Sequence, residues 1–413
     1  MRSWTEVVIP SIDSTLKFPA LQLTNSASGT KELTPPKPLY RMYVCGITPY
    51  DATHLGHAAT YLTFDLINRY LRASGSQVRY VQNITDIDDP LLERAKRDGV
   101  DWTELANQQI DLFRRDMVNL RVIPPADYIG AVDGIPLVTA AIEELARKES
   151  IYTVDNDLYF KVHADRNFGQ RSHLSQEEML RIFSERGGDP DRVGKSDPLD
   201  CLVWMSQRPN EPGWPSPFGL GRPGWHIECT AIAMKYLEPS LDDESLIDIQ
   251  GGGSDLIFPH HEMCAAQAQV LTEKPLAHTY VHAGMIGLDG EKMSKSKGNL
   301  VFVSKLVSDG RDPMAIRWAL MKNHYRTDRM WTDNLLVTSE KEIAALRSAL
   351  SQKSVAPTKE LIERIVNFLA DDLDTHSITE AIKVWVQSTQ SGDTGGDADS
   401  LAKTLDTLLG VKL

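Results

Sequence analysis

The chain has 413 residues, 41% of them hydrophobic and 24% charged, and a formal net charge of −13. This is the composition of an ordinary soluble protein, and it excludes a disordered, collagen-like or coiled-coil chain. The length predicts two or three domains. The sequence has no apolar run of membrane-spanning length and no secretory signal in its first residues, so we expect a cytoplasmic protein without membrane contact.

Acidic side chains outnumber basic ones, which works against long-range attraction of a polyanion such as nucleic acid. The four cysteines, Cys45, Cys201, Cys229 and Cys264, are spread over more than half of the chain. This spacing does not indicate a disulfide scaffold, and it leaves thiols available for metal binding or chemistry. For Cys201 the simplest interpretation is a small buried hydrophobic residue.

Residues 1–40 are rich in proline, serine and threonine, and we expect them to form an irregular lead-in. A strand at 40–44, a glycine-containing turn, a helix at 55–74 and a strand at 78–81 follow. This order is the βαβ unit of a parallel, nucleotide-binding sheet.

Residues 90–223 show helical periodicity and then a stretch interrupted by glycine and proline, which predicts a helical insertion between two halves of the sheet. The sheet is expected to resume at 246–249 and 280–288. We therefore predict three parts: an α/β, Rossmann-like catalytic domain at 41–300, a connecting segment at 301–340 and a short C-terminal helical bundle at 341–413. The bundle carries 8 basic and 11 acidic residues, so it is poorly suited to reading a nucleic-acid backbone.

His54 and His57, with Gly56 between them, stand where the first predicted strand passes into the first predicted helix. Side chains three residues apart share a face of a helical turn, and a helix N-terminus attracts phosphate. The pair is suited to stabilising charge that builds on an α-phosphate. Two ordinary histidines at a helix start would give the same pattern.

A second candidate phosphate site follows the last predicted strand, in the loop Lys292-Met293-Ser294-Lys295-Ser296. The ammonium groups of Lys292 and Lys295 suit the β- and γ-phosphates of ATP, where charge accumulates as diphosphate leaves. The alternative is a solvated basic loop.

Together the two motifs resemble the HIGH and KMSKS signatures of class I aminoacyl-tRNA synthetases, with Leu55 in the variable second position. The resemblance implies a Rossmann-like fold and activation of an amino acid by ATP, with Mg²⁺, to an aminoacyl adenylate. It also implies that His54, His57, Lys292 and Lys295 are the catalytic residues that handle phosphate charge.

Cys45, Cys229 and His260 each lie next to an element of the predicted sheet, and thiolate with imidazole ligands favours Zn²⁺. The surrounding segments, residues 42–51, 224–229 and 248–262, resemble cysteinyl-tRNA synthetase. The resemblance implies one zinc ion per subunit, held by these three residues, that binds the thiol of substrate cysteine. Cysteine would thereby be separated from serine without editing.

The fourth ligand of that family, a glutamate, would fall four residues after His260, where this chain has Cys264. His260 and Cys264 would lie on one helical face. An open three-ligand site fits the expected chemistry, and a closed structural site with three cysteines and one histidine is the alternative.

A further motif, Glu185-Arg186-Gly187-Gly188-Asp189-Pro190, resembles a signature of the cysteine ligases of mycothiol biosynthesis. That family joins L-cysteine, through cysteinyl-AMP, to the amine of glucosaminyl-inositol, so tRNA is not expected as a partner and a monomer is expected. Without the resemblance, the residues of this motif indicate only a turn. A shortened cysteinyl-tRNA synthetase and a non-catalytic synthetase-like protein are the alternatives.

The same resemblance implies which residues line the cysteinyl-adenylate pocket. Trp225 would pack near the cysteine moiety, although a core indole is the alternative. The glycine-rich turn Gly253-Ser254-Asp255 would contact adenosine and its ribose, and Ile286 would contact the adenine. The expected pocket residues are Cys45, Gly46, Ile47, Thr48, Thr60, Asn83, Ile84, Thr85, Trp225, Gly253, Ser254, Asp255 and Ile286.

Overall fold

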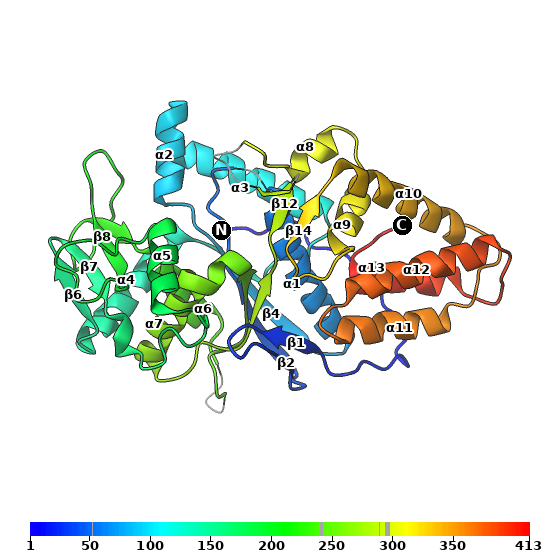
Figure 1. Ribbon diagram of the computed structural model, residues 1–413, viewed down its shortest axis with the longest axis horizontal. Coiled ribbons are helices and arrows are strands. Elements are labelled where there is room, and N and C mark those ends of the chain that lie inside the picture. Colours follow the sequence, from blue (N-terminus) through cyan, green and yellow to red (C-terminus); the bar gives the residue numbers. More distant parts are fainter. Residues whose placement is uncertain (52, 240–242, 289, 294–297) are drawn as a thin grey trace.

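A five-stranded parallel sheet lies at the centre of the computed structural model, which describes residues 1–413 except 52, 240–242, 289 and 294–297 (Figure 1). The strand order is β11-β10-β3-β4-β5, and every neighbouring pair is parallel. The strands are β3 (Leu39–Val44), β4 (Gln77–Ile84), β5 (Asp127–Gly130), β10 (Ile247–Gly253) and β11 (Ala277–Ala283). The Rossmann-like sheet predicted from the sequence is therefore confirmed.

Helix α1 (Leu55–Ala73) connects β3 to β4, as the βαβ pattern predicts. It is buried around most of its circumference, because it lies between the sheet and the C-terminal helices. The β4 strand is likewise buried along its last five residues, as expected of a parallel sheet covered on both faces.

Two segments differ from the sequence-based expectation. The lead-in contains an antiparallel hairpin formed by β1 (Gln22–Asn25) and β2 (Thr30–Leu33). Ser26 lies in the turn of this hairpin, and its N–H donates to the carbonyl of Tyr280 in β11 at 2.8 Å. The sheet also takes β5 from within residues 90–223, the range assigned to the insertion, so the part of that range up to Gly130 belongs to the sheet domain. All three strands are too short for hydrophobic periodicity to distinguish them from loops.

The insertion combines helices with a second sheet, whereas the sequence predicted mainly helices. Its four strands are antiparallel in the order β6-β7-β8-β9, and helices α4, α6 and α7 pack against one another beside them (Figure 1). Between β4 and β11, the elements other than β5 and β10 are α2 (Asp89–Asp98), α3 (Trp102–Asn119), α4 (Ala131–Arg147), β6 (Ile151–Val154), β7 (Asp157–Phe160), η1 (Val162–Ala164), α5 (Gln176–Glu185), β8 (Cys201–Ser206), β9 (Gly221–Pro223), α6 (Trp225–Tyr236), η2 (Ser254–Leu256), η3 (Ile257–His261) and α7 (Glu262–Thr272).

The other end of the molecule is helical (Figure 1). A small sheet, β13-β12-β14, precedes four long helices, the first of which begins at Asp333, ahead of the predicted start at residue 341. The elements are β12 (Ile286–Leu288), β13 (Glu291–Lys292), α8 (Val303–Ser308), α9 (Pro313–Met321), β14 (Arg329–Trp331), α10 (Asp333–Leu350), α11 (Lys359–Ala370), α12 (Thr375–Gln390) and α13 (Ala398–Leu409).

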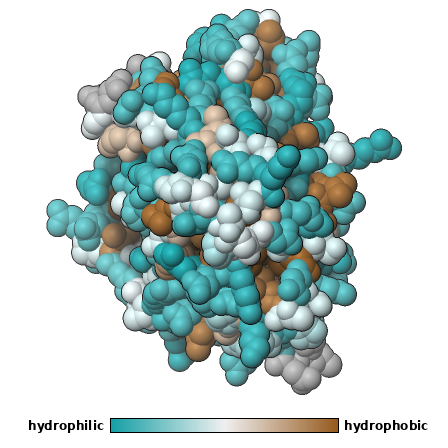
Figure 2. Space-filling model, turned by 90° about the vertical axis from the view of Figure 1, so that its right-hand side faces the viewer, coloured by the Kyte–Doolittle hydropathy of each residue, from teal (hydrophilic) through white to brown (hydrophobic). Residues whose placement is uncertain are grey.

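A buried charge cluster attaches these helices to the catalytic domain. Asp65 of α1 accepts from Nε of Arg69 at 2.7 Å and from the guanidinium of Arg317 in α9, and all three side chains are fully buried. Nε of Arg317 also donates to the carbonyl of Leu409 at the end of α13 at 2.6 Å. The surface on this side is mostly hydrophilic, with scattered apolar residues (Figure 2). Among the described residues, no helix combines the length and apolar character needed to cross a membrane.

Candidate active site

The carboxyl edge of the central sheet brings together three side chains that are far apart in sequence. Cys45 follows β3, Cys229 lies in α6 and His260 lies in η3. One ligand atom from each lies within 4.8 Å of the other two, and all three residues are buried. The predicted grouping of Cys45, Cys229 and His260 is therefore present in the fold.

The donor set fits a zinc ion. Two thiolates on tetrahedral zinc lie about 3.8 Å apart, given Zn–S bonds of about 2.3 Å, so the observed spacing needs only small side-chain movements. Burial alone would raise the pKa of the Cys229 thiol, but its interactions with Cys45 and His260 lower that pKa well below the usual value. The neighbouring Cys264 and Cys229 raise the pKa of His260 well above its usual value, against the effect of burial. A metal cation bound here would therefore displace a proton from His260 and be held by thiolate and neutral imidazole.

Cys264 stands outside this group. Its sulfur donates to the backbone carbonyl of His226 at 3.3 Å and lies 3.8 Å from Nε2 of His260. Among the described residues, the group with metal-binding geometry contains Cys45, Cys229 and His260 without Cys264. The geometry favours the open three-ligand arrangement over the closed one.

A series of buried polar side chains in contact with one another extends from the sulfur of Cys45 to Ser26. Its sulfur lies 3.3 Å from Nε2 of His261 and accepts from the amide of Gln250 at 3.3 Å. Nδ1 of His261 lies 2.7 Å from Nε2 of His282, whose Nδ1 lies 2.8 Å from the hydroxyl of Ser26. None of these four residues was predicted as part of the site from the sequence. The only local signal was the His260-His261 pair, because Ser26 and His282 meet through the hairpin that packs on β11.

Trp225, at the start of α6, stacks on the His260 ring with a centroid distance of 4.3 Å and an interplanar angle of 25°. Its side chain is half-buried, so it is not a core indole. Nδ1 of His226 lies 3.0 Å from Nδ1 of His260 on the same side. The indole therefore borders the three-residue group, where the resemblance placed the cysteine moiety.

The ends of β3 and β4 are joined by a second polar cluster. The N–H of Gly46 donates to the side chain of Asn83 at 2.7 Å, and a Cβ on Gly46 would lie 1.9 Å from the backbone oxygen of Asn83, so only glycine fits there. Asn83 and Thr85 both donate to the buried Glu228, at 2.8 and 3.1 Å. Burial raises the pKa of Glu228 well above its usual value. Glu228 was not predicted as a site residue from the sequence, although it stands next to Cys229.

The other predicted pocket residues lie in segments that end at this edge or follow it along the chain. The N–H of Thr85 donates to the carbonyl of Ile47 at 3.1 Å, and the Thr48 hydroxyl donates to Asp88 at 3.4 Å. A Cβ on Gly253 would lie 3.8 Å from the hydroxyl of Thr60 and 2.5 Å from the Asp255 carboxylate.

Ile84 ends β4, and Ser254 opens η2 directly after β10. Ile286 is buried in β12, which belongs to the separate three-stranded sheet.

His54 and His57 form a stacked pair at the start of α1, with ring centroids 3.6 Å apart. Nδ1 of His54 accepts from the N–H groups of Gly56 and His57, at 3.1 and 3.4 Å. Burial lowers the pKa of His54 to about 4, and burial together with His54 lowers the pKa of His57 well below its usual value. At neutral pH both rings are uncharged, so they can offer N–H groups to phosphate but not a positive charge.

The chain after the predicted lysine loop returns to this histidine pair. His54 and Phe302 form an isolated antiparallel bridge, in which the N–H of Leu55 donates to the carbonyl of Val301 at 2.9 Å. The backbone of Lys292 lies in β13, and Lys295 lies outside the described residues. Residues 301–303, which follow the predicted lysine loop in the chain, are therefore held next to His54 by backbone hydrogen bonds.

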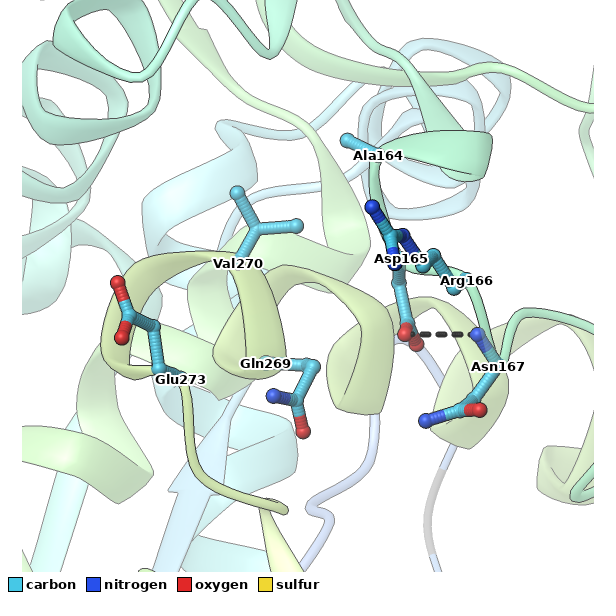
Figure 3. A pocket seen from close by; sticks show the side chains of 7 residues that line it. All are labelled: Ala164, Asp165, Arg166, Asn167, Gln269, Val270 and Glu273. Atoms are coloured by element: carbon cyan, nitrogen blue, oxygen red, sulfur yellow. Dashed lines mark hydrogen bonds between the residues drawn. The ribbon is translucent and has the colours of Figure 1, made fainter.

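A surface pocket of about 340 Å³ shares no lining residue with the three-residue group. Figure 3 shows the side chains that line it. It is formed by Gln269, Val270 and Glu273 at the end of α7 and by residues 164–167 opposite them. Cys264 lies nearer the start of the same helix, so this pocket is not part of the candidate site.

The chain is similar in sequence to one named group of ligases over its whole length. It matches the family "tRNA synthetases class I (C) catalytic domain" over residues 35–341. A relative from Kribbella flavida, named L-cysteine:1D-myo-inositol 2-amino-2-deoxy-alpha-D-glucopyranoside ligase, is 53% identical over 416 residues, which cover 100% of both chains. A relative of the same name from Nakamurella multipartita is 54% identical over 418 residues, again covering 100% of both. The chain belongs to this cysteine ligase family.

Solved structures of low sequence identity show the same fold. Mycobacterium tuberculosis methionyl-tRNA synthetase, in complex with methionyl-adenylate, matches with a TM-score of 0.61 at 17% identity, over 91% of this chain and 89% of that chain. The LeuRS of Agrobacterium radiobacter K84, in a ternary complex, also gives a TM-score of 0.61, at 12% identity over 91% of this chain and 83% of that chain. The cysteine ligase family thus shares the class I synthetase fold, as the sequence predicted.

Proposed function

We propose that the protein joins L-cysteine to the amine of glucosaminyl-inositol at the expense of ATP, through cysteinyl-AMP. The products are the amide, AMP and diphosphate. The observation that carries this proposal is the buried group of Cys45, Cys229 and His260 at the carboxyl edge of the sheet, in a chain whose full-length relatives are named as this ligase.

Cysteine selection is assigned to a zinc ion, one per chain, held by Cys45, Cys229 and His260. Such an ion would act as a Lewis acid: its open coordination site would bind the thiolate of cysteine and would discriminate against the neutral hydroxyl of serine. The donor chemistry supports this assignment, because all three groups are buried and the pKa of Cys229 is lowered. Trp225 stacks on His260 and so borders the proposed ion site on one side.

Adenylate formation is assigned to the two histidines and the two lysines, with Mg²⁺ accompanying ATP. A carboxylate oxygen of cysteine attacks the α-phosphorus, and diphosphate leaves. The backbone N–H groups fix Nδ1 of His54 as an acceptor, so the proton of the neutral ring is at Nε2, which can donate to the phosphate. Lys292 and Lys295 are proposed to balance the charge on the leaving diphosphate.

Amide formation then requires the sugar amine to attack the carbonyl carbon of the adenylate. The nitrogen loses a proton, the C–O bond to phosphate breaks and AMP leaves. The polar cluster of Asn83, Thr85 and Glu228 is proposed to line this position, because it lies next to Cys229 at the ends of β3 and β4. Positioning supplies most of the rate, since an acyl phosphate is already activated.

A small-molecule acceptor suits the chain better than tRNA. The residues from 341 onward carry 8 basic and 11 acidic side chains, which gives no attraction to a phosphate backbone. We place the reaction in the cytoplasm, where ATP is available and where the four cysteines, all free thiols in the structure, stay reduced.

The proposal is tested by two assays on the purified protein. Cysteine-dependent exchange of label between diphosphate and ATP measures adenylate formation, and it should be strong with cysteine and absent with serine. Transfer of labelled cysteine should then occur to glucosaminyl-inositol and not to tRNA. Charging of tRNA with the amino sugar ignored would contradict the proposal.

A further inference from the structure

We propose that Arg186 is the positioning residue that holds the loop from Gly253 to His261 in shape. This loop, which we call the ligand loop, joins the predicted adenosine contacts to the predicted zinc ligand His260. The inference therefore rests on the proposed function. It gives a role to the Glu185–Pro190 motif, for which the sequence alone offered only a turn.

The guanidinium of Arg186 reaches from the insertion to the ligand loop. Its Nη1 donates to the backbone carbonyl oxygens of both Asp255 and Phe258. Arg186 directly follows α5, and α5 packs on η3, the segment that contains His260. The half-buried side chain of Arg186 thus connects the end of α5, in the insertion, to the ligand loop.

The two carbonyls need this donor because the helix is broken between them. In an α-helix the carbonyl of Asp255 would accept from the N–H of residue 259, but that residue is Pro259, which has none. Phe258 itself has non-helical angles, φ −141° and ψ 138°, and the N–H of Glu262 donates to the carbonyl of Pro259. Arg186 therefore supplies hydrogen bonds that the backbone of the loop cannot make, and carbonyls left without them would cost free energy.

The motif around Arg186 is built to hold that side chain still. Gly187 has a φ of +85°, and a Cβ on Gly188 would lie 2.5 Å from the Phe183 ring, so both positions require glycine. The carboxylate of Asp189 accepts from the Tyr159 hydroxyl and, at 3.0 Å, from the ammonium of Lys195. The turn is therefore fixed to β7 on one side and to the rest of the insertion on the other.

Hydrogen bonds to both carbonyls should fix the positions of Asp255 and His260 together. Asp255 lies next to Gly253, on the side assigned to adenosine, and Phe258 lies two residues before His260. If Arg186 is lost, the loop can relax and His260 can move relative to Cys45 and Cys229. Groups that orient a metal ligand typically change metal affinity or activity about 10–100-fold when they are removed.

The test compares Arg186→Met with Arg181→Met, a matched control on α5 whose exposed side chain pairs with Glu185. We expect Arg186→Met to release zinc to a coloured chelator about tenfold faster than wild type and to raise the KM for cysteine in the exchange assay by a similar factor. Backbone amide exchange in residues 254–261, measured by mass spectrometry, should be faster in Arg186→Met. Arg181→Met should match wild type in all three measurements.

Arg186→Lys provides the conservative variant. A lysine ammonium can donate to one of the carbonyls but lacks the planar guanidinium, so an intermediate zinc-release rate and KM are expected. If Arg186→Met does not fold, Arg186→Lys alone decides, by the same comparison with Arg181→Met. A folded Arg186 variant with unchanged zinc release, KM and amide exchange would overturn the inference.

The failure of the proposed function gives a different result. If the wild-type protein bound no zinc and gave no cysteine-dependent exchange, the assigned reaction would be wrong. The amide-exchange comparison would still show whether Arg186 holds the ligand loop, because it needs neither metal nor substrate.

Discussion

Nδ1 of His54 accepts a hydrogen bond of 3.1 Å from the backbone N–H of Gly56, so the first histidine of the motif is also the N-cap of α1. A cap satisfies N–H groups that have no partner within the helix. The same contact places the ring proton on Nε2, the atom available to a ligand. One side chain therefore serves the stability of the helix and the chemistry proposed at its end.

The two roles of His54 can be separated by substitution. An asparagine side chain at this position would keep a capping oxygen, whereas alanine removes the cap, so we expect His54→Ala to lose about 1 kcal/mol of unfolding free energy and His54→Asn to lose much less. Both variants should slow cysteine-dependent exchange by about 10²-fold or more, because neither replaces the Nε2 donor. Urea unfolding and the exchange assay measure the two effects. Near-wild-type exchange in His54→Asn would show that the ring is only a cap.

The proposed zinc ligands give a second prediction. Cys229→Ser should lose zinc and cysteine activation together, because a serine hydroxyl is a poor zinc ligand. Cys264→Ser is the matched control, since the sulfur of Cys264 donates to the carbonyl of His226 instead. Zinc content by mass spectrometry should stay near one ion per chain in Cys264→Ser. Loss of zinc from that variant would support the closed site with four protein ligands.

Much of the candidate site follows from local rules. Parallel strands end at one edge of a sheet, so the residues after β3 and β10 had to lie near one another, and Cys45 and His260 do. What the sequence could not show are contacts made by tertiary packing. Ser26 reaches His282 across 256 residues, and Arg186 reaches Phe258 across 72 residues. Neither pair has a periodicity or spacing that marks it, because each depends on how two separate units dock.

The buried charge cluster of Asp65, Arg69 and Arg317 predicts that a substitution within it has a large effect on stability. Asp65 balances two buried guanidinium groups, those of Arg69 and Arg317. We expect Asp65→Asn to lower the free energy of unfolding by about 3–5 kcal/mol, because it leaves buried positive charge without a partner. Glu185→Gln, which removes an exposed pair with Arg181, should change it by less than about 1 kcal/mol. Equal effects of the two substitutions in urea unfolding would contradict the assigned role of Asp65.

A last prediction concerns pH and Asp116 of α3. The residue is 1% exposed, so its carboxyl group is almost completely removed from water. Burial raises the pKa of Asp116 to about 7, with the Thr53 hydroxyl and Arg115 opposing the shift. The folded protein therefore keeps this proton between about pH 4 and 7, where the unfolded chain has lost it, so this residue lowers stability as pH rises through that range.

Asp116→Asn removes that dependence without changing the shape of the side chain. The variant should be more stable than wild type by on the order of 4 kcal/mol at pH 8, and the difference should shrink toward zero as the pH falls to about 4. Urea unfolding at several pH values measures it. Asp111→Asn is the control, because Asp111 lies exposed on the same helix in a pair with Arg114 and should give a curve parallel to wild type. A constant difference between Asp116→Asn and wild type across this range would mean that the Asp116 carboxyl titrates normally in the fold.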